Sequence, residues 1–172
     1  RTTLLNSMPQ QVLSNQVDLA VSVHPLEHPN LRVEPFTRGC MVCVVPLGHQ
    51  LTQLAAVRLA DLALHPVISH DPGIPFGQLV AAAFKKAGVE LNTRINVHQS
   101  DTACSLARAG AGVAIVDEFT AQGMGWTDLQ TLPLAEEIRL QPSIVRSVFD
   151  HGRSHADKFI EVLKELAPRR NP

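Results

Sequence analysis

Short apolar runs alternate along this chain with amphipathic stretches, and polar or glycine-containing segments separate them. Short runs that are rich in Val, Ile and Ala are typical of buried strands. The pattern predicts strands over 17–23, 40–45, 66–70, 93–98, 113–116, 129–134 and 142–149. Residues 24–35 hold three prolines and little periodicity, so a loop is predicted there.

Helices are predicted between these strands from capping residues and from glycines that end a helix. Ser7 can accept hydrogen bonds from the first free amides of a helix, and Pro9 lacks the N–H that would be unpaired there. Further helices are predicted from Gly73 to Gly88, from Ser100 to Gly110, after Asp117 and over 154–166, with an amphipathic turn over 57–64. In the last helix an apolar stripe is formed by Phe159, Ile160, Leu163 and Leu166. This alternation predicts an α/β fold with mostly parallel sheets and helices on both faces.

Composition narrows the class of protein. The 172 residues are 45% hydrophobic and 18% charged, which is typical of a globular domain with a substantial core. The formal charge of -1 argues against a chain that grips nucleic-acid phosphates by itself. No apolar run is long enough for a membrane helix, and residues 1–16 lack the pattern of a leader peptide. A soluble, cytoplasmic protein is therefore expected.

Cysteine and histidine patterns predict neither a metal site nor a cofactor. Cys40 and Cys43 lie in one predicted strand, where positions three apart point to opposite faces, so both are expected in the core. Three cysteines favour a reducing compartment over a disulfide framework. Among the eight histidines, His24 and His28 lie in a proline-rich loop and His151 and His155 flank a turn, so neither pair has the helix on both sides that a metal site of this spacing needs.

Two loops that follow a predicted strand and precede a predicted helix carry polar side chains. They are Ser69-His70-Asp71-Pro72-Gly73 and Gln99-Ser100-Asp101-Thr102. In open α/β sheets, ligands bind beyond the carboxyl ends of the strands, where helix N-termini offer free amides and a partial positive charge. Ser100 and Asp101 are equally suited to act only as helix caps, so both roles stay open.

Three aspartates, Asp71, Asp101 and Asp117, each follow a predicted strand and are expected to rim one cleft. Their carboxylates would favour a cationic group, whereas the amides at Gly73 and Ser100 would suit a carboxylate. The hypothesis is therefore an amino-acid-like ligand that carries both charges.

Three segments carry a family resemblance. The segment Cys43-Val44-Val45-Pro46-Leu47-Gly48-His49-Gln50-Leu51 resembles the "vvP.gHpL" segment of LysR-type transcriptional regulators. The stretch from His98 to Val116 resembles the strand, helix and "aGxGvaiv" signature of that family's effector-binding domain. Val17-Asp18-Leu19-Ala20-Val21 is similar to its "vDlai" strand. The order and spacing agree across nearly the whole chain.

The resemblance implies the periplasmic-binding-protein type 2 fold, an α/β fold of two subdomains joined by crossover strands. Residues 1–67 would be the first part of subdomain I, residues 68–141 would be subdomain II, and residues 142–172 would return to subdomain I as a crossover strand and the C-terminal helix. The opening strand and helix of subdomain I would precede Arg1, so this subdomain is expected to be truncated at its N-terminus.

The resemblance also implies a function, which is sensing of a small-molecule effector in the interlobe cleft by a domain that is not an enzyme. The implied effector-binding residues are Ser69, His70, Asp71, Gly73, Ser100, Asp101, Thr102, Asp117, Phe119 and Thr120. The effector would alter the arrangement of a homodimer or tetramer, for which the segments 21–23 and 54–64 are candidate contacts. DNA would be bound by a helix-turn-helix domain that is absent from this chain. The segment 116–120 resembles regulators that respond to amino acids or opines.

Two alternatives stay open on the sequence alone. An extracytoplasmic solute-binding protein would share the fold and deliver its ligand to a transporter. An enzyme of the same architecture would need a convergent acid–base pair, for which only the neighbourhood of His70, Asp71 and His98 offers candidates. Fold by itself does not decide among these functions.

Overall fold

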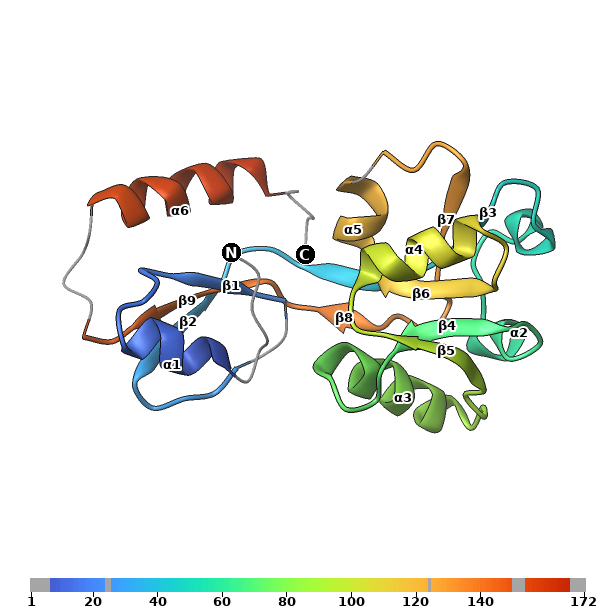
Figure 1. Cartoon of the computed structure of the whole chain (residues 1–172), viewed down its shortest axis with the longest axis horizontal. Coiled ribbons are helices and arrows are strands. Elements are labelled where there is room, and N and C mark those ends of the chain that lie inside the picture. Colours follow the sequence, from blue (N-terminus) through green and yellow to red (C-terminus); the bar gives the residue numbers. More distant parts are fainter. Residues whose placement is uncertain (1–6, 24–25, 124, 150–153, 168–172) are drawn as a thin grey trace. The chain divides into compact units, whose positions relative to one another are not determined.

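The computed structural model describes residues 7–23, 26–123, 125–149 and 154–167. The chain forms two compact units (Figure 1). Residues 1–38 and 140–172 belong to the first unit, and residues 39–139 form the second. The first boundary between the two units thus lies between residues 38 and 39, whereas the sequence suggested a subdomain boundary between residues 67 and 68. The reason is that the strand after residue 38 is central to the second unit's sheet.

The first unit is built on an antiparallel sheet with the strand order β1-β9-β2. Its strands are β1 (Ala20–Ser22), β2 (Leu31–Pro35) and β9 (Ser143–Ser147). Helix α1 (Met8–Leu13) buries Met8 and Val12 against Leu31 and Val145. Ser7 stands at the N-cap position as expected, but its side chain makes no capping hydrogen bond.

Two strand predictions for the first unit are corrected by the structure. The strand predicted over 17–23 is only three residues long, because regular pairing with β9 is confined to Ala20–Ser22. The loop predicted over 24–35 ends in strand β2, which pairs with β9 along its whole length. Strand β2 lies at the edge of the sheet, where a proline at its last position, Pro35, is tolerated.

Helix α6 (Ser154–Leu166) forms where it was predicted, but of its apolar stripe only Ile160 and Leu163 are half-buried, and none of the four residues is fully buried. Phe159 is 52% exposed and Leu166 is 78% exposed. The side chain of Arg146 in β9 instead pairs with Asp157 of the helix at 2.8 Å, and Glu34 of β2 pairs with Lys164. These strand residues alternate with Val33 and Val145, which face α1, so the opposite sheet face carries Glu34 and Arg146 together with the buried Ile144.

The second unit is built on a six-stranded sheet with the order β5-β4-β6-β3-β7, in which β8 pairs with β3. The strands are β3 (Gly39–Pro46), β4 (Val67–His70), β5 (Thr93–Val97), β6 (Val113–Asp117), β7 (Leu129–Pro133) and β8 (Arg139–Leu140). Strand β4 is parallel to β5 and β6, whereas β3 is antiparallel to β6 and β7. The prediction of mostly parallel sheets was therefore wrong. Apolar runs show that a strand is buried but not which way its neighbours run.

Helices cover this sheet and complete its core. They are the 3-10 helix η2 (Gln50–Gln53) and the α-helices α2 (Leu59–Leu62), α3 (Pro75–Ala87), α4 (Ser100–Arg108) and α5 (Glu118–Gly123). Helix α4 packs Ala103, Cys104 and Ala107 against Ile68, Val116 and neighbouring strand residues. Gly88 ends α3 in the left-handed conformation with φ +67°. Cys43 is buried and Cys40 half-buried, neither is in a disulfide bond within the described part of the chain, and burial raises the pKa of Cys43 to about 12.

The parallel pairing decides where the polar loops lie. Because β4 is parallel to both β5 and β6, the carboxyl ends of the three strands meet at one edge of the sheet (Figure 1). The loops after His70, Val97 and Asp117 leave from this edge and lead into α3, α4 and α5. We call it the polar edge.

Candidate functional site

His70 and Ser100 join two of the three loops of the polar edge. His70 is the last residue of β4 and Ser100 is the first residue of α4. The imidazole Nε2 of His70 lies 3.1 Å from the Ser100 hydroxyl oxygen, and both residues are buried. The backbone amide of Asp71 donates to the carbonyl of Val97 at 2.9 Å. The strand ends and the start of α4 therefore form one hydrogen-bonded unit.

A close approach of α3 fixes the position of His70 from the other side. A Cβ on Gly77 would lie 2.0 Å from the carbonyl oxygen of Asp71, so only glycine allows the first turn of α3 to sit against this backbone. The ring of Phe76 then meets the His70 ring edge-on, with the ring centroids 5.0 Å apart. Pro75 begins the helix, where its missing N–H costs no hydrogen bond.

Two buried polar atoms at the end of β4 have no hydrogen-bond partner among the described residues. They are the hydroxyl oxygen of Ser69, which is 1% exposed, and Nδ1 of His70, which is 2% exposed. Strand alternation places Ser69 on the face opposite His70, so its side chain does not reach the start of α4. Unpaired buried polar atoms are rare in folded proteins and call for an explanation.

Burial lowers the pKa of His70 to about 4. The negative charge of Asp117 opposes this shift, and the neighbouring His98 adds to it. The imidazole is therefore neutral near pH 7, and one of its two nitrogens carries the proton.

Asp71, Gly73, Asp101 and Thr102 are all at the polar edge, but they bond to one another locally. The amide of Gly73 donates to the Asp71 carboxylate at 2.7 Å, and the amide of Thr102 donates to the Asp101 carboxylate at 2.7 Å. The prediction that the Gly73 amide is open to a ligand carboxylate was therefore wrong. The Asp71 side chain forms a turn with its own loop, as aspartate commonly does.

At the third loop, β6 passes directly into α5: Asp117 ends the strand, and Phe119 and Thr120 lie in the first turn of the helix. The buried Asp117 carboxylate accepts from the amide of Thr120 at 2.8 Å and from its hydroxyl at 2.9 Å. The ring of Phe119 packs so closely on Gly39 that a Cβ there would lie 2.5 Å from it. Phe119 is thus occupied by packing within the unit, whereas Asp117 holds the turn that follows β6.

Two residues of this loop region were missed by the sequence analysis. The buried carboxylate of Glu118 accepts from the amide of Cys40 at 2.9 Å and so ties α5 to the start of β3. The indole of Trp126 donates to the carbonyl of Thr120 at 3.3 Å, and the Arg108 guanidinium lies over its ring. An acidic residue directly after a strand was a signal for Glu118, but nothing local in the sequence points from Trp126 to Thr120.

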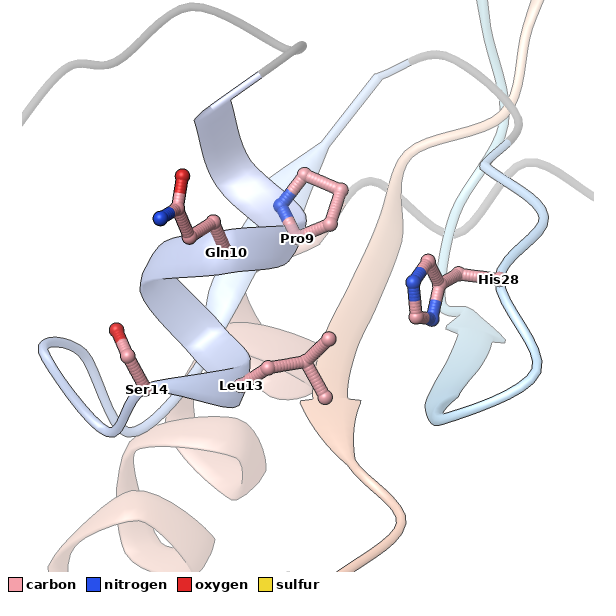
Figure 2. A pocket seen from close by; sticks show the side chains of 5 residues that line it. All are labelled: Pro9, Gln10, Leu13, Ser14 and His28. Atoms are coloured by element: carbon pink, nitrogen blue, oxygen red, sulfur yellow. The ribbon is translucent and has the colours of Figure 1, made fainter.

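A surface hollow of about 490 Å³ lies elsewhere, in the first unit. Figure 2 shows that it opens beside α1 and His28. It is lined by Pro9, Gln10, Leu13, Ser14 and His28, none of which was predicted as a site residue. Its lining is mostly apolar and carries no charged side chain, so it offers little to orient a polar ligand.

No group of three His, Cys, Asp or Glu side chains suited to a metal ion occurs among the described residues, and His24 and His151 lie outside them. Within the same part of the chain, no helix combines the length and the apolar character needed to cross a membrane.

An α/β chain whose parallel strand ends and helix N-termini gather polar side chains at one edge has the architecture of a ligand-binding domain. A family model described as "LysR substrate binding domain" matches residues 1–168. The chain belongs to this family of transcriptional-regulator domains, as the sequence resemblance implied. The match favours a regulatory binding domain over the two alternatives, a transport-linked solute-binding protein and an enzyme.

Relatives of known name agree with the family. Regulatory protein NocR of Agrobacterium tumefaciens (strain T37) is 33% identical over 122 residues, which are 68% of this chain and 41% of NocR. The octopine catabolism/uptake operon regulatory protein OccR of Rhizobium meliloti is 29% identical over 112 residues, which are 65% of this chain and 37% of OccR. The matched residues thus cover less than half the length of either regulator.

A solved structure confirms the fold. The regulatory domain of CcmR from Synechocystis PCC6803, solved in complex with 2-PG, superposes with a TM-score of 0.81 at 16% identity. The superposition covers 97% of this chain and 81% of the CcmR chain. The predicted α/β fold of LysR effector-binding domains, which is similar to periplasmic-binding-protein type 2 proteins, is therefore confirmed.

Proposed function

We propose that this domain senses an amino-acid-like small molecule at the polar edge of its second unit. The observation that carries the proposal is that the buried polar groups His70, Ser100 and Asp117 come together where three parallel strands end and α4 begins. Such groups are expensive to bury and are retained where they bind or orient a ligand.

The charges at the edge suggest which groups the ligand carries. In the first turn of α4 the amide of Thr102 is taken by Asp101, whereas the preceding amides of Ser100 and Asp101 are not capped by the side chain of the N-cap residue Gln99. This end of α4, with the Ser100 hydroxyl, suits a carboxylate. The carboxylates of Asp71, Asp101 and Asp117 suit an ammonium or guanidinium group, because each oxygen can accept a further hydrogen bond.

The ten residues expected from the sequence remain the proposed effector-binding set, but they contribute to binding in different ways. His70, Ser100, Asp101 and Asp117 are the members with polar groups toward the start of α4, and Thr102 and Thr120 steady two of the carboxylates. Gly73 holds the Asp71 carboxylate, Phe119 packs on Gly39, and Ser69 contributes a buried hydroxyl at the end of β4. A contribution from the first unit stays a prediction of the family resemblance.

An opine is the ligand class that we favour among amino-acid derivatives. The support is that OccR is named for octopine catabolism and uptake, and that NocR and OccR both match this chain across about two thirds of its length. Opines carry both carboxylate and cationic groups, in agreement with the charges at the polar edge.

The whole protein would be a DNA-binding regulator of the cytoplasm, in which a helix-turn-helix domain outside this chain contacts the promoter. The effector would favour one of two arrangements of a homodimer or tetramer by binding it more tightly. Exposed apolar side chains at Val21, Leu54 and Leu64 make the segments 21–23 and 54–64 candidate contacts between copies. The division into subdomains at residues 67 and 141 also stays a proposal.

A thermal-shift screen against amino acids, diamines, opines and aromatic acids tests the proposed function. A ligand at a hundredfold its Kd stabilises the folded state by about 2.7 kcal/mol. We expect a shift with an opine or a basic amino acid that is lost in Asp101→Asn and kept in the control Asp128→Asn, whose carboxylate lies on the surface. A shift with aromatic acids alone would discard the role of the carboxylates, and no shift with any compound would contradict the proposed function.

A further inference from the structure

The contact between His70 and Ser100 carries an inference about how the proposed site is regulated, and it rests on the proposed function. Nε2 of His70 and the Ser100 oxygen are within hydrogen-bond distance, while Nδ1 of the same ring has no partner among the described residues. The neutral ring has two tautomers. In the first, the proton is on Nε2 and Nδ1 is a buried acceptor without a partner. In the second, the proton is on Nδ1, which is then a buried donor without a partner.

The first tautomer is the better one. An unpaired buried N–H is rarer in proteins than an acceptor that lacks a donor. The proton is accordingly on Nε2, which donates to the Ser100 oxygen at 3.1 Å. The Ser100 hydroxyl proton is then free to point elsewhere, and its residue opens α4, where the backbone amides also point out of the helix.

We propose that His70 acts through Ser100 as a positioning residue, directing the Ser100 hydroxyl to an anionic group of the effector, and that anion binding is coupled to proton uptake by His70. An anion held at the start of α4 places a negative charge close to the imidazole, and a nearby opposite charge favours the protonated ring. By linkage, protonation of His70 in turn strengthens binding of the anion. Affinity therefore rises as the pH falls.

The charged groups around His70 are compatible with this coupling. Asp117 at the end of β6 attracts the protonated ring, and His98 after β5 opposes protonation. Asp101 on α4 and Asp71 in the following loop are each hydrogen-bonded to a neighbouring amide. Helix α3 contributes only the Phe76 ring to the contact. The bound anion would be the new charge that raises proton affinity.

Trifluoroacetate is a suitable probe, because it is a carboxylate that stays ionised at every pH at which the protein is folded. Its affinity is measured by fluorine NMR from about pH 5 to about pH 8, a range above the pKa of about 4 of His70 in the free domain, where only an anion-induced rise of this pKa makes binding depend on His70. We expect saturable binding that tightens several-fold toward the acidic end. Ser100→Ala should abolish it. His70→Gln keeps a donor near Nε2 but cannot titrate, so binding should persist with a flat pH profile.

Matched controls separate this coupling from a structural role. His98→Gln removes the neighbouring histidine and should leave the pH profile of binding in place. Nitrogen NMR of the imidazole in the unsubstituted domain gives a second readout, in which trifluoroacetate raises the pH at which His70 titrates. This readout does not depend on whether His70→Gln folds.

Three results overturn the inference: no saturable binding of trifluoroacetate, a pH profile unchanged in His70→Gln, or an unchanged His70 titration. The outcome is separable from that of the proposed function. If an opine binds but its affinity does not depend on the protonation of His70, the proposed function is supported and the inference fails. If trifluoroacetate is coupled to His70 but no screened compound binds, the inference stands and the proposed effector class fails.

Discussion

At the residue scale, the end of β4 holds two buried polar side chains whose hydrogen-bonding capacity is not fully used by the described residues. Ser69 and His70 are both buried, and each has an atom without a hydrogen-bond partner among the described residues. The packing around them is nevertheless tight, because Gly77 lets α3 approach and Phe76 closes on the ring. Such a costly arrangement is maintained by the surrounding core, and it gives His70 measurable effects on stability.

The first prediction is a pH dependence of stability that His70 causes. The folded pKa of His70 is lowered from 6.5 to about 4, so the unfolded chain binds more protons between these values. The stability contribution is present above about pH 6.5 and is lost as the pH falls toward about 4, by up to about 3 kcal/mol. Urea denaturation of the domain and of His70→Gln measures it. A loss of stability of the same size in both proteins would contradict the prediction.

The second prediction concerns the close approach at Gly77. Gly77→Ala places a methyl group against the carbonyl of Asp71, a backbone atom that cannot move aside cheaply. We expect a loss of about 1–3 kcal/mol in the free energy of unfolding, the usual cost of overpacking. Gly123→Ala is the matched control, because it has open space around the added methyl. Equal stabilities of the two variants in chemical denaturation would refute the steric argument.

At the element scale, periodicity identified most elements but not their neighbours. The apolar runs that became β3, β4 and β6 were sufficient to place these strands. Helices α3 and α4 also lie where they were predicted, but the N-cap of α4 is Gln99 instead of Ser100, and no side chain caps either helix. Strand β2 escaped because an edge strand with only Leu31 and Val33 directed toward α1 carries a weak apolar signal. Strand direction was misjudged because it is set by tertiary connections, which a local pattern does not contain.

Helix α6 is a case in which the pattern predicted the element correctly but not its burial. Its stripe of Phe159, Ile160, Leu163 and Leu166 has the period of a core-facing helix, but the adjoining sheet face presents Glu34 and Arg146. The periodicity of the helix indicates only that one of its faces is apolar. Whether this face is buried depends on which residues of the rest of the chain pack against it.

The third prediction follows for α6. Phe159→Ala removes a side chain that is more than half exposed, so we expect a change within about 0.5 kcal/mol in the free energy of unfolding. Ile144→Ala in the adjoining strand removes a fully buried side chain and should cost about 2–5 kcal/mol. Thermal and urea unfolding of both variants checks the contrast. A loss for Phe159→Ala as large as that for Ile144→Ala would show that the stripe is a core surface.

At the scale of the whole molecule, the sequence supported the family and the polar edge, but not the bonding within that edge. The placement of Ser100 at the start of a helix and of Asp117 at the end of a buried strand followed from pattern alone. That the Gly73 amide is taken by Asp71 did not, because a short-range turn competes with any ligand for the same donor. The network from Asp117 through Thr120 to Trp126 joins residues whose contact only the fold decides.

The fourth prediction uses this network as an internal reporter. Trp126 is the only tryptophan of the chain, and its indole N–H bonds to the carbonyl of Thr120 beside Asp117. Binding of an effector at the polar edge should change its fluorescence, and the Kd from the fluorescence titration should account for the size of the thermal shift. A ligand that stabilises the domain without any change in this fluorescence would point to a site away from the third loop.

The central claim is that the effector binds at the polar edge, and hydrogen exchange tests it most directly. The domain is compared with and without a compound that stabilises it in the screen. We predict slower exchange of the amides over 71–74, 99–103 and 117–121, and the same exchange as before at α1 and His28, beside the hollow of Figure 2. Protection confined to α1 and His28, with the three loops unchanged, would contradict the claim and move the effector site to the first unit.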